Sequence, residues 1–356
     1  MGVEVEIFTI RLKNLHIGRH VMVPRKGVLE DDENYHHDPS IGIEYGSRPF
    51  YSIREAFFGI KTGLRKSIAS YKLKYKKSNG DYTLFFAGTW RDRFAATHFH
   101  IGLGEEGIDF KDAAGLSRHI HGHLPFLIAL LANSPVYKST ILNIDSNRFL
   151  YAEKNFFSPL EFNELDREYK EEMTFNLDRK KRIPTLEIRP CDTNLPEYVV
   201  AGLVIIKAIS MAWLAGKRVS NINRYELHLK SRLNAAKYGP KAALYWNNRK
   251  IRAHTYLDKF FTEYKPYLLK MDIPPEIIEV FRLFKLGWNS AGIMRRACHF
   301  HQRRHPRTWQ RHFAGNYITG INALLNGETL DTFIRSFGLR PPNTKKGLSG
   351  RVRLGH

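Results

Sequence analysis

The chain has 356 residues, of which 56 are lysine or arginine and 35 are aspartate or glutamate, so its formal net charge is +21. Hydrophobic residues make up 43% and charged residues 26%, a balance that excludes a wholly disordered chain. This charge attracts anions, such as nucleotides, nucleic acids or acidic proteins, but it does not indicate which of them the protein binds. Two cysteines, Cys191 and Cys298, are too few for a disulfide framework or a four-thiolate zinc site.

The hydropathy pattern gives no membrane span, because no stretch of about 18 uninterrupted apolar residues is present. The longest apolar run extends from Tyr198 to Leu214 and is interrupted by Lys207, which favours a buried helix. The sequence opens on a strand pattern without a secretory signal. We therefore expect a soluble, cytoplasmic protein that does not bind a membrane.

Strand patterns dominate the first half of the chain. Apolar and polar residues alternate over residues 3–10, and this period of two predicts a half-buried strand. Similar patterns predict strands over 41–45, 95–103 and 185–189. Asn79-Gly80 predicts a hairpin turn between strands at 73–75 and 82–87. Helical spacing predicts helices over 52–72 and 110–132, and residues 136–182 have no clean period, which indicates a long loop with short helices.

After Pro196 the spacing is helical almost to the end of the chain. It predicts helices over 197–216, 221–237, 253–264, 275–286, 290–301, 316–325 and 329–337. Strands in the first half and helices in the second predict an α+β fold with an antiparallel sheet. We expect a core over 1–240, a helical basic part over 241–338 packed on that core, and a mobile basic tail over 339–356.

Charged and imidazole side chains repeat on one face of the predicted strands, because residues two apart on a strand point the same way. The pairs are Glu4 with Glu6, His98 with His100, and Glu187 with Arg189, and Glu44 ends a further strand shortly after Asp38. Each pair alternates with apolar residues that would face a core. The polar faces would then gather carboxylates, imidazoles and an arginine on one side of the same sheet.

Such a cluster needs cations, since carboxylates held close together repel each other. Carboxylates with a little imidazole suit Mg²⁺ or Mn²⁺, which keep open positions for phosphates. Arg189 would then clamp a phosphate oxygen. The alternatives are a solvated outer face for Glu4 and Glu6, a structural hydrogen-bonded role for the histidines, and a surface ion pair for Glu187 and Arg189.

Six segments match a known family in its own order along residues 2–240. They are Gly2-Val-Glu-Val-Glu6, Asp38 followed by Glu44, Thr97-His-Phe-His-Ile-Gly102, Leu130-Leu-Ala-Asn-Ser-Pro135, Pro184-Thr-Leu-Glu-Ile-Arg-Pro-Cys-Asp192 and Asn234-Ala-Ala-Lys-Tyr-Gly239. Together they resemble the glutamate–cysteine ligase type 2 family, the carboxylate–amine ligases of the glutamine synthetase superfamily. The resemblance implies a curved antiparallel sheet with helices on its convex face and with ATP and up to three Mg²⁺ on its concave face.

The resemblance also implies residue roles. The metal residues would be Glu4, Glu6, Asp38, Glu44, His98 and Glu187. Arg189 and Glu187 would be catalytic, and Arg189 would contact the transferring phosphate. In the wider superfamily the metal-ligand role belongs to the first of the two histidine positions, which is His98 here. His100 would then bind the nucleotide cofactor. The sequence departs from the family at residues 45–49 and 138–157. Arg48, in the first of these segments, could meet a substrate carboxylate or a phosphate, and Arg148, in the place of a family loop near the substrates, could contact a phosphate.

The activity implied is an ATP-dependent ligase that joins a carboxylate to an amine through an acyl phosphate and releases ADP and phosphate. The substrates would be small molecules or carrier-bound groups, and some family members form oligomers. The strand carboxylates alone also permit a nucleic-acid-binding protein or a metal-dependent nuclease.

The C-terminal part is strongly basic. Residues 281–327 hold no aspartate or glutamate, and the basic residues concentrate over 295–312. Arginines interleaved with Phe300 and Trp309 could bind an acidic protein or RNA, or form a solvated basic helix face. Zinc held by Cys298 and the histidines of this segment is a weaker alternative, because one cysteine with irregularly spaced histidines is a poor signal.

Overall fold

The computed structural model describes residues 1–18, 34–36, 41, 43–74, 82–155, 172–176 and 183–342. Its main sheet is antiparallel throughout. In spatial order its strands are β11 (Met173–Asn176), β12 (Thr185–Asp192), β8 (Ala96–Ile101), β1 (Gly2–Arg11), β4 (Ile43–Gly46) and β3 (Asn34–His36). Two further strands, β2 (His16–Gly18) and β5 (Tyr82–Phe85), pair with the second half of β1. This arrangement confirms the predicted α+β class.

The alternation in β1 separates two faces of the sheet. Val3, Val5 and Ile7 are buried, whereas Glu4 and Glu6 are only half-buried. The apolar residues of β8 and β12 are buried in the same way, so the three central strands present one apolar face to the core.

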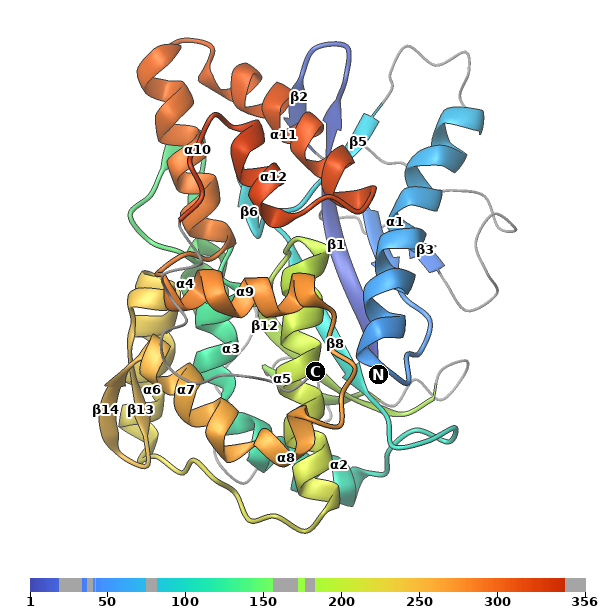
Figure 1. The fold of residues 1–356 in the computed structure, drawn as a ribbon, viewed down its shortest axis with the longest axis vertical. Coiled ribbons are helices and arrows are strands. Elements are labelled where there is room, and N and C mark those ends of the chain that lie inside the picture. The colour runs from blue at the N-terminus through green and yellow to red at the C-terminus, as the bar shows by residue number, and fades with distance from the viewer. Residues whose placement is uncertain are drawn as a thin grey trace.

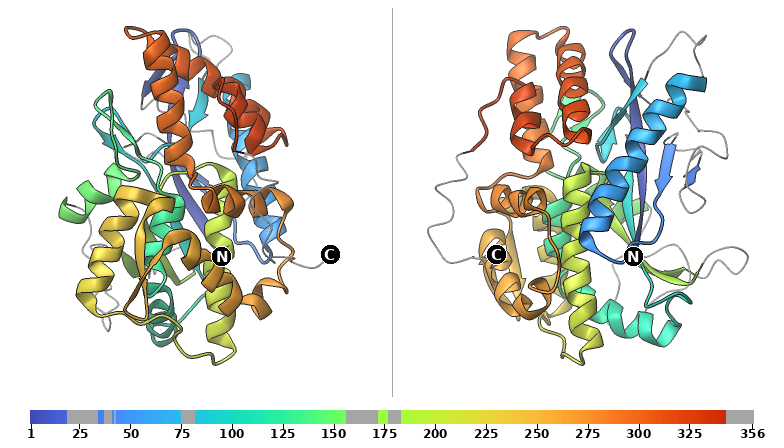
Figure 2. Two further views of the ribbon diagram at one scale, coloured as in Figure 1. Left: turned by 60° about the vertical axis from the view of Figure 1, so that its left-hand side comes forward. Right: turned by 45° about the vertical axis from the view of Figure 1, so that its right-hand side comes forward.

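Helices cover the apolar face and leave the polar face on the other side (Figure 1). They are α1 (Ile53–Lys74), α2 (Phe110–His121), α3 (Leu124–Leu131) and α5 (Pro196–Leu214). The two turned views show the same separation, with α1 and α5 on one side of the strands (Figure 2). Gly202 of α5 lets the helix approach the sheet, because a Cβ there would lie 2.8 Å from the Phe99 ring.

The rest of the chain adds short hairpins and the C-terminal helices. The short elements are β6 (Thr89–Trp90), β7 (Arg93–Phe94), β9 (Val136–Tyr137), β10 (Thr140–Ile141), α4 (Asn147–Asn155), β13 (Ala243–Trp246) and β14 (Arg249–Arg252). The helices are α6 (Tyr225–Tyr238), α7 (Ala253–Glu263), α8 (Lys265–Leu268), α9 (Pro275–Lys285), α10 (Ser290–Arg304), α11 (Trp309–Leu325) and α12 (Leu330–Ser336).

Buried side chains from both halves form one hydrophobic cluster. Tyr317 of α11 illustrates the join, since its hydroxyl accepts the N–H of Phe86 at 3.0 Å and its ring packs edge-on to Phe85 of β5. The C-terminal helices therefore pack on the sheet part. The domain boundary near residue 240 stays a prediction, and most of the predicted tail lies outside the described residues.

Two sequence predictions for this part are wrong. Residues 110–132 form two helices, not one, because Pro125 has no N–H to continue the ladder. The carbonyl of Gly122 instead accepts hydrogen bonds from Asn221 and from the Tyr256 hydroxyl. The expected hairpin between 73–75 and 82–87 is also absent, since Leu73 belongs to α1 and β5 pairs with β1.

Other elements were not expected from the sequence. Strand β11 extends the sheet within the stretch predicted to be a loop. Strands β13 and β14 form a hairpin between helices, turned by Asn247 and Asn248 with φ of 47° and 64°. Asparagine tolerates this left-handed conformation better than most residues, so Asn-Asn was a usable turn signal.

Helix α5 is long and apolar enough to cross a membrane, the one helix among the described residues of which this is true. Within the fold, 78% of its most apolar window is buried. Its residues pack against the sheet and against neighbouring helices, which confirms the expectation of a buried helix over 198–214.

Candidate functional site

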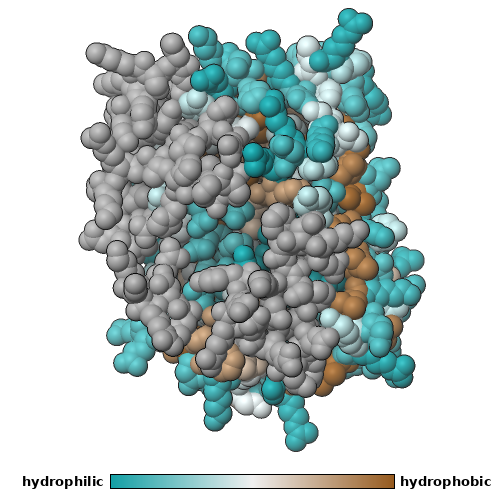
Figure 3. Space-filling model, turned by 180° about the vertical axis from the view of Figure 1, so that it is seen from behind, coloured by the Kyte–Doolittle hydropathy of each residue, from teal (hydrophilic) through white to brown (hydrophobic). Residues whose placement is uncertain are grey.

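The polar face of the sheet brings the predicted strand residues together. In the strand register Glu4 of β1 lies opposite His98 of β8, and His100 lies opposite Glu187 of β12. Directly opposed residues point to the same face, so these four side chains share one surface. Seen from the side opposite to Figure 1, hydrophilic residues lie near the middle of the molecule (Figure 3).

The distances show that the four side chains form one cluster. Nδ1 of His98 lies 3.3 Å from Oε1 of Glu187 and 3.8 Å from Oε2 of Glu4. Nε2 of His100 lies 3.4 Å from the same Glu4 oxygen. One ligand atom each from Glu4, His100 and Glu187 falls within 4.8 Å of the others, a spacing that could hold a metal ion.

The electrostatics of the cluster reflect its mixed charges. Burial alone would raise the pKa of Glu4, but hydrogen bonds with His100 and His98 outweigh it and hold that pKa well below its usual range. Burial would lower the pKa of His98, yet its hydrogen bond with Glu4 and the charge of Glu187 raise that pKa. The carboxylates therefore favour positive charge at this point of the sheet.

A second acidic pair flanks the cluster. Glu6 lies opposite Glu44 in the β1–β4 register, on the same face as Glu4. Oε2 of Glu6 accepts the N–H of Ala96 at 2.6 Å, which orients this carboxylate toward the start of β8. Asp38, the remaining predicted metal residue, lies outside the described residues.

Arg189 stands at the edge of the cluster. Its Nε lies 3.4 Å from Oε1 of Glu187, whose other oxygen accepts a hydrogen bond from Asn176 Nδ2 at 3.4 Å. The strand register shifts between Ile188 and Cys191, so β12 bulges at Arg189 and Pro190. Bulges re-aim side chains near functional sites. Asn176 was missed by sequence reasoning, because it lies on β11.

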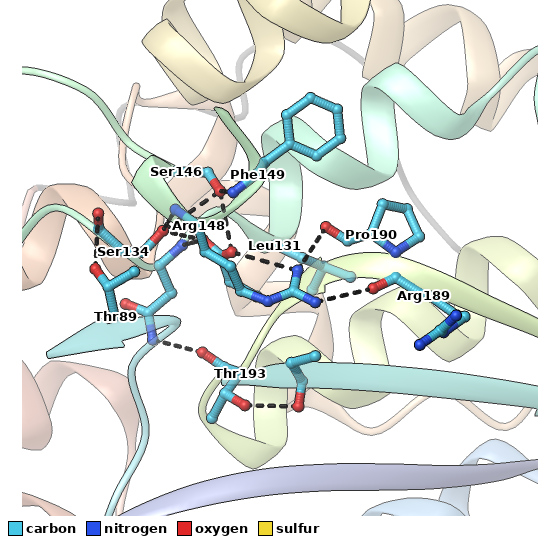
Figure 4. A network of polar contacts seen from close by, with 12 residues as sticks. Thr89, Leu131, Ser134, Ser146, Arg148, Phe149, Arg189, Pro190 and Thr193 are labelled. Atoms are coloured by element: carbon cyan, nitrogen blue, oxygen red, sulfur yellow. Dashed lines mark hydrogen bonds and ion pairs between the residues drawn. The ribbon is translucent and has the colours of Figure 1, made fainter. Parts of the chain in front are cut away.

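Arg148 is buried, and its guanidinium faces the main chain (Figure 4). Its two terminal nitrogens donate to the carbonyls of Pro190 and Arg189, each at 3.3 Å. On the other side of the strand, the Arg189 N–H donates to the carbonyl of Glu172 at 2.9 Å. Both polar main-chain groups of Arg189 are thus fixed, and Arg148 is placed to hold the strand bulge rather than to reach across the sheet.

Asp192 anchors this network, and sequence reasoning gave it no role. Its carboxylate accepts the N–H of Asn133 and the hydroxyl of Ser134 at 2.7 Å, and the hydroxyl of Ser146 at 3.0 Å. Burial raises the pKa of Asp192, although Arg148 at 4.0 Å and these donors oppose the shift. The segments around residues 133 and 190, both part of the family-like motifs, therefore meet here.

Arg48 follows β4 near the start of β1. Its guanidinium lies 3.4 Å from Oε1 of Glu55 in the first turn of α1. The preceding residue, Ser47, accepts the N–H of Val3 at 2.9 Å. Arg48 is thus half-exposed beside the strand end that carries Glu4 and has an acidic partner.

The basic C-terminal part lines two open pockets. One, of about 430 Å³, lies between the β1–β2 turn, the residues after β6 and the start of α11, and its basic residues include His16, Arg91, Arg307 and Arg311. The other, of about 580 Å³, is lined by Trp288, Arg296, His299, Arg303, Leu339 and Arg340. In the described residues Cys298 and His301 are buried and form no metal-binding group with their neighbours.

The sheet and its covering helices form a fold that is shared with several solved ligases. The chain is similar to the Pup ligase PafA, solved in complex with the prokaryotic ubiquitin-like protein Pup, at 10% identity and a TM-score of 0.55. That match covers 96% of this chain and 79% of PafA. The family resemblance of the motifs is thereby confirmed as a likeness of fold.

Two other solved structures share the fold. Glutamate–cysteine ligase of Francisella tularensis, in complex with AMP, matches at 11% identity and a TM-score of 0.55, over 95% of this chain and 97% of that one. A bifunctional glutathione synthetase of Pasteurella multocida matches at 13% identity and a TM-score of 0.57, over 94% of this chain and 55% of that one. The sequence matches no protein-family model and no curated protein.

Proposed function

We propose that the protein is an ATP-dependent ligase that joins a carboxylate to an amine. One observation carries the proposal: Glu4, His98, His100 and Glu187 converge from three strands on the polar face of a sheet with this fold. The proteins of similar fold are themselves named as ligases or as a synthetase, one solved with AMP and another with ADP.

The donor set of the cluster fits Mg²⁺ or Mn²⁺. Carboxylate oxygens are the ligands that Mg²⁺ prefers, and Mn²⁺ also accepts imidazole. The raised pKa of His98 indicates a site with an excess of negative charge, where a divalent ion can replace the bound proton. We assign Glu4 and Glu187 as metal residues together with His100, whose ligand atom lies within 4.8 Å of theirs. Glu6, Glu44 and His98, with Asp38 from the sequence, are assigned as further metal residues around them. When bound, Mg²⁺ supplies neutralisation of phosphate charge.

The other residues of the candidate site would have separate roles in the reaction. Arg189, half-buried at the edge of the cluster, would stabilise charge on the phosphoryl group during its transfer. His100 would bind the metal and, beside it, the nucleotide phosphates, because its Nδ1 is fixed by Thr185 Oγ1 at 3.0 Å and its Nε2 faces the Glu4 carboxylate. Arg148 would keep Arg189 in place through the main chain. Arg48 would meet a substrate carboxylate.

The reaction would proceed in two steps. A carboxylate oxygen attacks the γ-phosphorus of ATP, the bond from that phosphorus to the β-phosphate oxygen breaks, and ADP leaves. The amine then attacks the acyl phosphate, loses a proton and forms the amide as inorganic phosphate departs. Because a carboxylate is a poor electrophile in water, the acyl phosphate is what makes amide formation favourable.

The basic pocket near α11 supports a large anionic substrate, such as a carboxylate carried by an acidic protein. Arg91, Arg307 and Arg311 line it. PafA, with the same fold, was solved with a protein partner, Pup. We propose that residues 1–240 hold the catalytic site and that residues 241–338 add this pocket. We also propose that the protein is cytoplasmic and that it forms an oligomer.

The decisive experiment measures ADP release from ATP and Mg²⁺ across a panel of amino acids, amines and acidic peptides, with the mass of any product determined. A ligase forms ADP only when a productive carboxylate is present, and it yields a condensed product. Cleavage of RNA or DNA with metal alone, and no ADP, would replace the proposal by the nuclease alternative.

A further inference from the structure

A second group of metal-ligating side chains lies outside the strand cluster. His121 is the last residue of α2, His228 lies in the first turn of α6, and Glu172 precedes β11. All three side chains are buried, with exposures of 4%, 1% and 0%. One ligand atom from each lies within 4.8 Å of the other two.

We infer that His121, Glu172 and His228 form a binding site for a divalent transition-metal ion, with Zn²⁺ as the best fit. Two imidazoles and one carboxylate are a ligand set that zinc uses, leaving a fourth position for water. The ligand atoms of a tetrahedral Zn²⁺ site are separated by roughly 3.4 Å. Small side-chain rotations would close the observed spacing to that value.

The state of His228 supports this assignment. Its Nε2 is buried and has no hydrogen-bond partner among the described residues. A buried polar atom without a partner is unfavourable, so such an atom calls for an ion or a water. The His228 ring stacks on the His121 ring, with centroids 3.8 Å apart and planes at 17°, so the two imidazoles lie face to face.

The charge around the site selects among metals. Arg232 is fully buried and forms an ion pair with Oε2 of Glu172, so this carboxylate is oriented by a neighbouring cation. Glu172 and Arg232 together are neutral, which leaves little electrostatic attraction for Mg²⁺ or Ca²⁺. Binding must then rest on metal–imidazole bonds, which favour zinc, cobalt or nickel.

The site would also touch the strand that carries Arg189. The carbonyl of Glu172 accepts the Arg189 N–H at 2.9 Å, so a metal on the Glu172 side chain would fix the main chain beside the strand cluster. It would join α2, α6 and the edge of the sheet at one point. The inference stands on this geometry and does not depend on the proposed ligase activity.

The test uses the full chain, stripped of metal and kept in excess Mg²⁺ to occupy the strand cluster. Zn²⁺ binding is measured by calorimetry, and Co²⁺ is used as a visible-spectrum probe of imidazole ligation. We expect one equivalent of Zn²⁺, and binding at least tenfold weaker in His228→Gln and His121→Gln. His119→Gln, a buried histidine outside the group, and Glu187→Gln should bind Zn²⁺ as the wild type does.

Two results would overturn the inference. One is a wild-type chain that takes up no Zn²⁺ and gives no Co²⁺ spectrum under these conditions. The other is unchanged Zn²⁺ binding in both histidine variants. Because the wild-type measurement decides on its own, a variant that fails to fold does not leave the question open. Loss of zinc in Glu187→Gln alone would assign the bound ion to the strand cluster instead.

Discussion

Nδ1 of His98 lies 3.3 Å from Oε1 of Glu187, although the residue opposite Glu187 in the strand register is His100. Glu187 therefore reaches diagonally along the sheet, and both histidines of β8 face the same group of carboxylates. This diagonal contact joins β8 to β12 at the point where Arg189 begins the bulge. It makes Glu187 the residue whose loss should disturb the cluster most.

Replacing Glu187 by Gln, or Arg189 by Ala, should lower the rate of ADP formation by about 10²–10³-fold, because each change removes charge that acts on the phosphates. The melting temperature should change little, since glutamine keeps the shape of the buried Glu187 side chain and Arg189 is partly exposed. Glu226→Gln and Arg249→Ala, at exposed positions, are the matched controls. Wild-type rates of ADP release in both site variants would show that the site is wrongly assigned.

Arg148 should act through Arg189. Arg148→Lys should lower kcat by about tenfold to a hundredfold, since lysine cannot donate to two carbonyls in the same fork. In the double variant with Arg189→Ala the rate should fall no further than in Arg189→Ala alone. Multiplicative losses would mean that Arg148 contacts the substrates itself. Circular dichroism spectra would verify that the variants are folded.

The basic pocket gives a prediction about substrate size. Arg307→Ala and Arg311→Ala should raise KM for an acidic peptide substrate by about tenfold. KM for ATP should stay unchanged, since none of the strand-cluster residues lines this pocket. The effect should shrink as salt rises, because exposed charges are screened. Arg335→Ala, an exposed residue of α12, is the control. An equal effect on KM for ATP would contradict the assignment of the pocket.

The buried ion pair between α1 and α5 gives a prediction about stability. Nζ of Lys61 lies 2.6 Å from Oε1 of Glu197, and both side chains are almost completely buried. Lys61→Met should cost about 3–5 kcal/mol of unfolding free energy, because it leaves the buried carboxylate unpaired. Adding Glu197→Gln should recover much of that loss. Urea unfolding measures both values, and equal destabilisation in the single and double variants would contradict this account.

His123 makes stability depend on pH. It is buried, and its nitrogens contact the hydroxyls of Tyr256, Ser220 and Tyr264 at 2.8, 3.0 and 2.9 Å. Burial, with the charges of His119 and Lys217, lowers its pKa from 6.5 to about 3. Between these two values the unfolded chain binds the extra proton, so the stabilising contribution is complete above pH 6.5 and is lost as the pH falls toward 3.

The loss should amount to about 1.4 kcal/mol for each pH unit in that window. Urea unfolding of the wild type and His123→Gln between pH 7 and 4 measures the two slopes. The variant should be less stable at pH 7 and should lose less stability on acidification. Identical slopes would show that His123 is protonated in the folded chain.

The sequence predicts the strand cluster because the alternation over 3–10, 95–103 and 185–189 fixes which side chains share a face. It does not predict Asn176, since the short strand β11 has no clear period and gains its place only by pairing with β12. Nor does it predict that Arg148 serves the main chain of Arg189. That role depends on contacts between segments more than 40 residues apart in sequence.

Turn and break signals explain the remaining differences. Gly122 and Pro125 divide the helix predicted over 110–132, yet the apolar spacing continues through them and hides the break. The zinc candidates His121 and His228 come from different helices, and Glu172 directly precedes an unpredicted strand. Only the tertiary structure brings such groups together, so no local pattern in the sequence marks them.

Metal binding in the presence of ATP tests the central claim most directly. Mn²⁺ bound to the full chain can be counted by electron paramagnetic resonance, with and without ATP, in the wild type and in Glu4→Gln and Glu187→Gln. We predict ATP-dependent Mn²⁺ binding by the wild type that falls at least tenfold in both variants. Mn²⁺ binding that is indifferent to ATP, or that survives in both variants, would contradict the account.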